Sequence, residues 1–243
     1  MRRFFLVLLL VLTLPGVASA ALVQACSTRD FEGVRFTVCP FDSNRAELRL
    51  VRSPTRGFAG LRSVLGASAD KVLFALNAGM FDDNGAPVGL YIERGIERHP
   101  LNTANGDGNF YMKPNGVFFE DADGTLHIKT TTAYDVHGRA PRWATQSGPM
   151  LVIHGTLNPQ ITHDGPSRYI RNAVCLRDPH TAIFAISENL VSFGKLARFL
   201  HDTMNCREAL YLDGAVSSLW LPSQSRMDNR TQLGPMAVVL QKK

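Results

Sequence analysis

The stretch Ala209-Leu-Tyr-Leu-Asp213-Gly-Ala-Val-Ser217-Ser218 joins a short apolar run to a carboxylate, a glycine and two hydroxyls. Fully buried strands read as short apolar runs of this kind. In open α/β sheets, the residues just past the carboxyl ends of such strands carry the chemistry. We therefore expect a strand over residues 209–212, with Asp213 at its carboxyl end as a candidate functional residue.

A second acid stands in the same relation to another apolar run. Glu188 follows residues 181–187, and between the two runs Ser192 is a plausible N-cap for a helix that extends to about Met204. A strand–helix–strand unit implies a right-handed crossover and parallel pairing, which places Glu188 and Asp213 at one edge of one sheet. Two carboxyl groups suit glycoside hydrolysis: one protonates the leaving oxygen, and the other acts as nucleophile or as base for water.

The rest of the chain reads as strands and hairpins with few helices. Strands are expected over residues 33–38, 46–51, 71–76 and 236–240, hairpins over 117–129 and 172–187, and a short helix over 61–65. No internal repeat, low-complexity stretch or Pro/Gly/Ser linker divides the sequence. These patterns predict an α+β fold: a single domain over residues 26–243, built on a mixed, strand-rich sheet with hairpins and a few helices.

The N-terminus reads as a secretory signal over residues 1–20. Arg2 and Arg3 precede an apolar segment over residues 4–14, and small residues follow up to Ala20, the expected cleavage site. The apolar segment is short for a membrane span, although an uncleaved anchor is the alternative. We expect a periplasmic or secreted protein with no stable membrane span after cleavage. The net charge of +5 comes from scattered residues, so no nucleic-acid partner is expected.

The chain has four cysteines, and an even number in an exported protein favours two disulfides. Three connectivities exist; Cys26–Cys39 and Cys175–Cys206 are favoured because each pair flanks the ends of neighbouring elements. A zinc site is the competing interpretation, but the sequence has neither a CxxC motif nor close Cys/His spacing. No metal or cofactor is therefore predicted.

Several short motifs are weak when taken alone. The blocks Asn77-Ala-Gly79, Asn115-Gly116 and Gln146-Ser147-Gly148-Pro149 fit either a ligand site or ordinary turns. Arg171 opens the strand expected before residues 181–187. Its guanidinium would suit a phosphate or a carboxylate partner, whereas a solvated or salt-bridged arginine is the alternative.

Taken in order, these blocks resemble the phosphodiester glycosidase family over about residues 70–240, with the look of a bacterial, exported branch. The resemblance implies hydrolysis of a sugar-1-phosphodiester at the glycosidic C–O bond. It implies that Asp213 and Glu188 form the catalytic acid pair and that Arg171 contacts the phosphodiester. The residues that it implies for substrate binding are Asn77, Gly79, Asn115, Gly116, Gln146, Ser147, Gly148, Asn172, Gly214 and Ser217.

The chain departs from the family pattern at two places. Asp213-Gly-Ala-Val-Ser217 replaces the usual Asp-Gly-Gly-x-Ser, and Arg171-Asn-Ala replaces Arg-Thr-Ala. The methyl group of Ala215 supports an alternative function, a non-catalytic glycan-phosphate binding protein of the cell envelope. A third interpretation is a phosphodiesterase that cuts the P–O bond, which normally requires metal ions. In each case the expected partner is a sugar phosphate or glycan.

Overall fold

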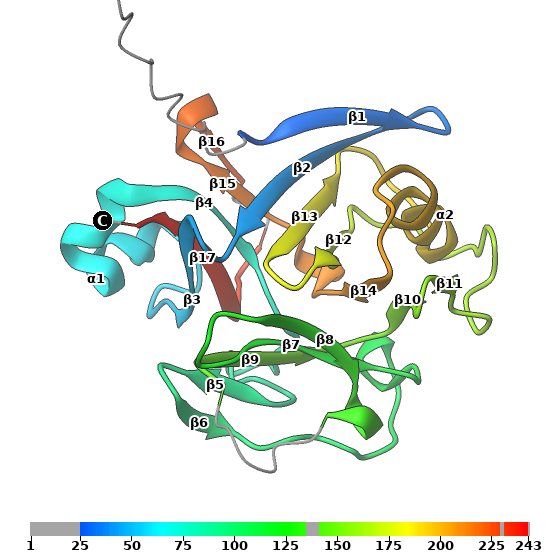
Figure 1. The fold of residues 1–243 in the computed structure, drawn as a ribbon, viewed down its shortest axis with the longest axis horizontal. Coiled ribbons are helices and arrows are strands. Elements are labelled where there is room, and N and C mark those ends of the chain that lie inside the picture. Colours follow the sequence, from blue (N-terminus) through cyan, green and yellow to red (C-terminus); the bar gives the residue numbers. More distant parts are fainter. Residues whose placement is uncertain (1–24, 135–140, 229–230, 243) are drawn as a thin grey trace, which may run out of the picture.

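The computed structural model describes residues 25–134, 141–228 and 231–242. Within these residues the strands form three sheets and the helical segments are short (Figure 1). Every ladder between the described strands is antiparallel. The α+β class and the strand-rich single domain are therefore confirmed, whereas the mixed sheet is replaced by three antiparallel ones.

Seven strands form the first sheet. They are β1 (Ser27–Phe31), β2 (Val34–Asp42), β10 (Met150–Ile153), β11 (Thr156–Leu157), β12 (Asn172–Asp178), β13 (Thr181–Ser187) and β14 (Glu208–Tyr211). Their order across the sheet is β1-β2-β13-β12-β14-β10-β11. Strands β13 and β14 run in the same direction, as the crossover predicted, but β12 lies between them and pairs with both. The expected direct parallel pairing is therefore wrong, because the β12–β13 hairpin fills the place next to β14.

The second and third sheets have five strands each. The second contains β3 (Ala46–Arg52), β4 (Val72–Asn77), β15 (Leu219–Leu221), β16 (Arg226–Met227) and β17 (Pro235–Gln241), in the order β16-β15-β4-β17-β3. The third contains β5 (Tyr91–Glu93), β6 (Ile96–His99), β7 (Gly116–Glu120), β8 (Leu126–Thr130) and β9 (Trp143–Ser147), in the order β6-β5-β9-β7-β8. In Figure 1 the third sheet lies below the other two.

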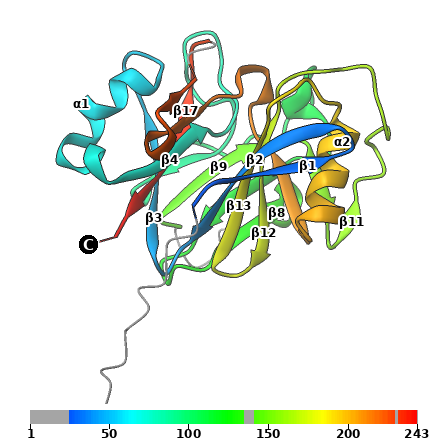
Figure 2. The same cartoon turned by 90° about the horizontal axis from the view of Figure 1, so that it is seen from above.

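The described residues contain two α-helices, α1 (Leu61–Leu65) and α2 (Phe193–Arg198). Helix α2 begins as predicted, because the Ser192 hydroxyl accepts a hydrogen bond from the Lys195 backbone N–H, and it continues as a π-helical turn to Thr203. Figure 2 shows α1 beside β4 and β17, and α2 beside β1 and β2. The two helices therefore cover different sheets.

The central core lies where the three sheets face one another. Phe184 of the first sheet, Phe74 of the second and Phe118 of the third are buried in one cluster, and Phe184 contacts both other rings edge to face. Helix α2 covers the outer face of the first sheet, and α1 covers that of the second. The central strands are thus buried on both faces, which explains why their sequences are continuous apolar runs.

Both favoured disulfides are formed. Cys26, directly before β1, is bonded to Cys39 of β2, and Cys175 of β12 is bonded to Cys206, which precedes β14. The described residues include no free cysteine. The second bond ties the end of the crossover helix to the central strand of the first sheet, close to the strand that leads to Asp213.

The predicted signal segment, residues 1–20, lies outside the described residues. No helix among the residues that are described is long and apolar enough to cross a membrane.

Candidate active site

Asp213 lies at the junction of the first and second sheets. The chain leaves β14 after Tyr211, and the Leu212 backbone N–H donates to the Asn172 carbonyl at the start of β12. The Asp213 backbone N–H then donates to the Ala78 carbonyl, just after β4, at 2.9 Å. The loop that carries Asp213 is therefore fixed to both sheets through its backbone, and Asp213 itself is only 9% exposed.

A buried network of side-chain amides holds this loop in place. The Asn172 side-chain N–H group donates to the Asn77 side-chain oxygen at 3.0 Å, and the same oxygen accepts from the Ser218 N–H at 2.9 Å. The Asn77 side chain in turn donates to the Asp213 carbonyl, and the Ser217 hydroxyl donates to Asn172 Oδ1 at 3.3 Å. Because these polar groups bond to one another, Asn77, Asn172 and Ser217 act as a brace for the loop.

The third sheet reaches the same place. The Gly79 N–H donates to Thr145 Oγ1 of β9 at 3.2 Å, and a Cβ at Gly79 would approach the Gln146 carbonyl to 2.5 Å. Chain positions 147–149 then lead from β9 into the first sheet, where the Tyr211 N–H donates to the Pro149 carbonyl at 3.0 Å. The motifs around Asn77, Ser147 and Asp213, far apart in sequence, are thus brought together where the three sheets meet.

The Gln146 side chain is saturated by protein groups. Its oxygen accepts from the backbone N–H groups of Leu90 and Asn102, both at 2.9 Å. Its N–H groups donate to the Asn102 carbonyl at 2.7 Å and to Thr131 Oγ1 at 3.1 Å. Gln146 therefore holds the segment after β4 against the third sheet and has no free group for a ligand.

Two neighbouring polar atoms in the same region have no hydrogen-bond partner among the described residues: Asn115 Oδ1 and Ser147 Oγ. Both residues are buried, and Gly116 pairs with Ser147 in the ladder between β7 and β9. A Cβ at Gly148 would approach the Asn115 Cβ to 2.5 Å, so glycine permits this close packing. Asn115 also lines a cavity of about 420 Å³. Buried polar atoms are nearly always paired, so these two mark a place for water or ligand.

Arg171 is fully buried on the α2 side of the first sheet. Its guanidinium donates to the Val191 carbonyl at 2.9 Å, to Tyr211 Oη at 2.8 Å and to both oxygens of Ser167, and it lies 3.7 Å from the Phe193 ring centre. Burial lowers the pKa of Arg171, while the Tyr211 hydroxyl opposes that shift. Arg171 has no exposed surface, and its hydrogen bond to Tyr211 connects it to the strand that leads to Asp213.

Tyr211 connects this buried cation to the Asp213 loop. Burial raises the pKa of its phenol, and Arg171, together with a backbone hydrogen bond from Gly214, favours the opposite direction. A Cβ at Gly214 would collide with the Tyr211 hydroxyl, so a residue larger than glycine does not fit in this arrangement. Sequence reasoning missed Tyr211 because it sits inside the apolar run; its phenol, two residues before Asp213, was the available signal.

Glu188 has polar partners of its own. Its Oε1 accepts from Thr37 Oγ1 at 2.5 Å and from Arg226 Nη1 at 2.6 Å. Arg226 also donates to both oxygens of Asp228, and Asp228 accepts from the Leu219 N–H directly after the Asp213 loop. Glu188 is therefore an ion-paired carboxylate linked to that loop through Arg226 and Asp228, neither of which any sequence motif indicated.

The two acids lie at the same edge of the first sheet, as expected. Ile186, Asn172 and Leu212 form one row across β13, β12 and β14, so the strand ends that carry Glu188 and Asp213 are two strand spacings apart, about 10 Å. Thr37, which binds Glu188, pairs with Ile186. The side chain of Ala215 lies outside what the structure describes.

Comparisons with known proteins found a matching family model, a sequence relative and a similar solved structure. The family model for phosphodiester glycosidases matches residues 70–236. The chain is 33% identical to the uncharacterized protein YigE of Escherichia coli (strain K12) over 223 residues. This match covers 91% of this chain and 85% of YigE. The fold of the chain is similar to that of the catalytic domain of zebrafish N-acetylglucosamine-1-phosphodiester alpha-N-acetylglucosaminidase, solved in a form auto-inhibited by its pro-peptide. The TM-score is 0.59 and the sequence identity 14%, and the match covers 90% of this chain and 82% of that one.

Proposed function

The chain belongs to the phosphodiester glycosidase family, and we propose that it hydrolyses the glycosidic C–O bond of a sugar-1-phosphodiester by carboxylate acid/base chemistry. The observation that carries this proposal is the convergence of the family's separate motifs on the Asp213 loop. Backbone hydrogen bonds from the Asp213 loop and β14 reach Ala78 and Pro149, and side-chain bonds reach Asn77 and Asn172. Such bracing fixes the backbone that carries the Asp213 carboxylate before substrate arrives, which supports positioned catalysis.

The surroundings of the two acids suggest different roles. Glu188 accepts hydrogen bonds from Thr37 and Arg226, so its surroundings hold it as an acceptor rather than as a proton donor. Glu188 therefore takes the role of nucleophile at the anomeric carbon or of base for the attacking water. Asp213, which is nearly buried beside the Tyr211 phenol, takes the role of acid toward the leaving phosphate oxygen.

Arg171 has a positioning role in this proposal. Its guanidinium donates to the Tyr211 hydroxyl, and Gly214, next to Asp213, packs closely against that hydroxyl. The Arg171 guanidinium has no carboxylate among its hydrogen-bond partners in the described structure. Its positive charge therefore favours a negatively charged substrate at the Asp213 loop. The contact to the phosphodiester is thus electrostatic and passes through Tyr211.

Asn115 and Ser147 are the side chains that we assign to the substrate. Their side-chain oxygens have no hydrogen-bond partner in the described structure, and Asn115 lines the 420 Å³ cavity. A sugar hydroxyl can donate to either oxygen and so satisfy a group that the protein leaves unpaired. The other predicted binding residues hold the backbone of the site in place. Four do so through side-chain hydrogen bonds within the protein: Asn77, Asn172, Gln146 and Ser217. Four glycines allow close packing of neighbouring segments: Gly79, Gly116, Gly148 and Gly214.

We further propose that the protein is exported to the periplasm or secreted as a member of a bacterial branch of the family. The two disulfides support this location, since such bonds persist in oxidising compartments. The basic, apolar and small-residue segments of residues 1–20 support it from the sequence.

The test is hydrolysis of a panel of sugar-1-phosphodiesters in water enriched in ¹⁸O. Cleavage of the C–O bond places the label in the released sugar, and mass spectrometry of both products detects it. Label in the phosphate would mean that the P–O bond is cut, which contradicts the proposal. Saturable binding in calorimetry without any product would instead identify a non-catalytic glycan-phosphate binding protein.

A further inference from the structure

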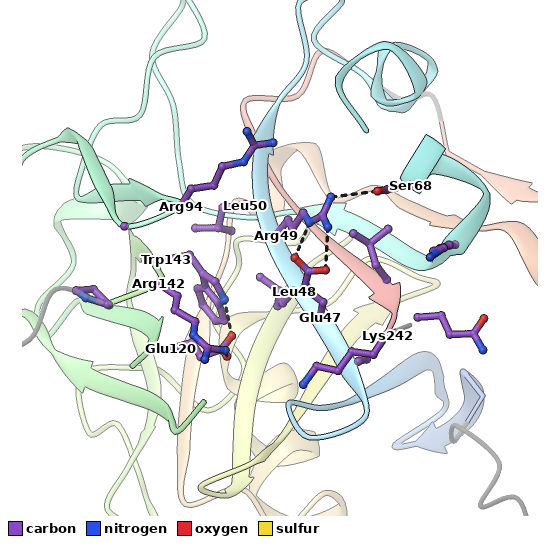
Figure 3. A pocket seen from close by; sticks show the side chains of 16 residues that line it. Glu47, Leu48, Arg49, Leu50, Ser68, Arg94, Glu120, Arg142, Trp143 and Lys242 are labelled. Carbon is purple, nitrogen blue, oxygen red and sulfur yellow. Dashed lines mark hydrogen bonds and ion pairs between the residues drawn. The ribbon is translucent and has the colours of Figure 1, made fainter. Parts of the chain in front are cut away.

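A cavity of about 900 Å³ lies away from the Asp213 loop. It lies between the edge strand β3, the end of β17 and the third sheet (Figure 3). Strand β17 pairs with Asn77 at Met236, and its far end lines the cavity at Leu240 and Gln241. The cavity lining includes none of the residues assigned to the Asp213 site, so this cavity is separate from the proposed active site.

Positive charge dominates the walls of this basic cavity, which we define by its five cationic lining residues: Arg49, Lys71, Arg94, Arg142 and Lys242. In Figure 3, Arg94 and Arg142 extend from the third sheet, whereas Arg49 and Lys242 extend from the second. Cations from different parts of the chain therefore surround one volume, which has the size of a small-molecule site.

The two carboxylates in the lining are already engaged. Glu47 forms a two-bond fork with Arg49, at 2.6 and 2.8 Å. Glu120 accepts from Trp143 Nε1 at 2.7 Å and from Arg142 at 3.1 Å. Each carboxylate thus offsets one arginine.

Three cations in the basic cavity remain without a carboxylate partner among the described residues. The Lys242 ammonium donates to the Ser43 carbonyl, which is neutral. The side chains of Lys71 and Arg94 make no hydrogen bond or ion pair within the described structure. An excess of about three positive charges in one concave volume attracts ligands with several negative charges.

We propose that the basic cavity is a second ligand site, which binds a small molecule carrying two or more phosphate groups. Phosphate suits this lining because arginine offers a planar fork of donors and lysine a mobile point charge. The free edge of β3 adds unpaired backbone groups along one wall, which can bond to sugar hydroxyls. Phosphorylated sugars and inorganic polyphosphate share this chemistry.

The experiment is calorimetric titration of the full mature chain with three probes: inorganic tripolyphosphate, glucose 1,6-bisphosphate and neutral glucose. We expect saturable binding of the two phosphate probes at 50 mM NaCl and none of glucose. Binding should weaken strongly at 500 mM NaCl, where charges at the surface are screened. Tighter binding of the bisphosphate than of tripolyphosphate would identify a sugar phosphate as the ligand.

The variant Lys71→Gln/Arg94→Gln removes two charges that form no hydrogen bond or ion pair in the described structure, so folding should be unaffected. It should bind both phosphate probes at least fivefold more weakly. The matched control, Arg29→Gln/Arg62→Gln, removes two charges from exposed positions elsewhere and should bind within twofold of the wild type. Equal affinity of the first variant and the control, or no saturable binding by the wild type, would overturn the proposal. Asp213→Asn should leave binding unchanged, which separates this site from the active site.

Discussion

The hydroxyl of Tyr211 is the joint between a buried cation and the Asp213 loop, and Tyr211→Phe removes it alone. The change leaves Arg171 Nη1 without its acceptor in a fully buried place. A hydrogen bond to a charged group contributes about 1.5–3 kcal/mol, and leaving a buried donor unsatisfied costs about 1–3 kcal/mol. Because the two terms overlap at Arg171, we expect a loss of about 2–4 kcal/mol in the free energy of unfolding.

The protein offers a matched control in Tyr134→Phe. Tyr134 is also buried, but its hydroxyl has no hydrogen-bond partner in the described structure, and burial raises its pKa to about 12. Removing an unsatisfied hydroxyl should be neutral or slightly stabilising. Both variants lose the same atom from the same residue type, so the comparison isolates the hydrogen bonds.

The assay is urea unfolding at pH 7 with the disulfides intact, followed by circular dichroism. With a dependence of about 1–3 kcal/mol per molar urea, the Tyr211→Phe midpoint should fall by roughly 1 M or more, and the Tyr134→Phe midpoint should stay near that of the wild type. Tyr211→Phe should also lower kcat by at least about tenfold, since Arg171 is then no longer linked to the strand that leads to Asp213. Equal midpoints for the two variants would refute the reasoning.

Three further predictions follow from the same contacts. Gly214→Ala places a methyl group against the Tyr211 hydroxyl, so it should cost about 1–3 kcal/mol in urea unfolding and lower kcat at least tenfold; a fully active variant would contradict the packing. The Cys175–Cys206 disulfide closes a loop with a sequence separation of 31, against 13 for Cys26–Cys39. Because the longer loop gains more entropy when it is opened, Cys175→Ser/Cys206→Ser should lower the free energy of unfolding by about 4 kcal/mol, and Cys26→Ser/Cys39→Ser by about 3 kcal/mol. The reverse order would argue against the entropic explanation. Burial raises the pKa of Glu120 above its ordinary 4.5, so the folded state holds this proton more tightly and the stability of the wild type should fall as pH rises above 4.5. When urea midpoints are compared from pH 4.5 to 7.5, Glu120→Gln should lack the part of this fall that Glu120 causes. Parallel pH profiles of the two proteins would exclude a contribution from Glu120.

The strands of the core were predictable from sequence because they are buried on both faces. Residues 209–212 and 236–240 appear as unbroken apolar runs, and the structure covers one face with the other sheets and the opposite face with α1 or α2. The same property misled the prediction of pairing. A continuous apolar run indicates that a strand is buried on both faces, and this is common in parallel sheets. Here helices cover the outer faces of antiparallel sheets, so the same pattern arises without the parallel pairing and the mixed sheet that we expected.

Short strands of the third sheet were missed for the opposite reason. Strand β6 is largely exposed, and β5 spans three residues, so neither shows a long apolar pattern. Helix α2 was found because Ser192 caps it and its apolar residues follow helical spacing. Local chemistry thus identified elements whose boundaries are set by neighbouring residues.

For the site, sequence order identified the blocks but could not assign each residue its work. Asn77 and Asn172 were expected to bind substrate. In the structure their side chains bond to each other, and Asn77 also bonds to the Asp213 loop. The partnership of Glu188 with Arg226 joins residues that are 38 positions apart, and no spacing rule connects them. Such contacts depend on how three sheets meet, which pairwise patterns in the sequence do not encode.

The most direct measurement is the rate of sugar-1-phosphodiester hydrolysis by Asp213→Asn at saturating substrate. Asparagine keeps the size and the backbone bonds of the loop but cannot transfer the proton, so kcat should fall at least about 100-fold. The control Asp70→Asn changes an exposed, ion-paired aspartate and should keep wild-type kcat. Wild-type kcat in a folded Asp213→Asn protein would contradict the assignment of Asp213 as the catalytic acid.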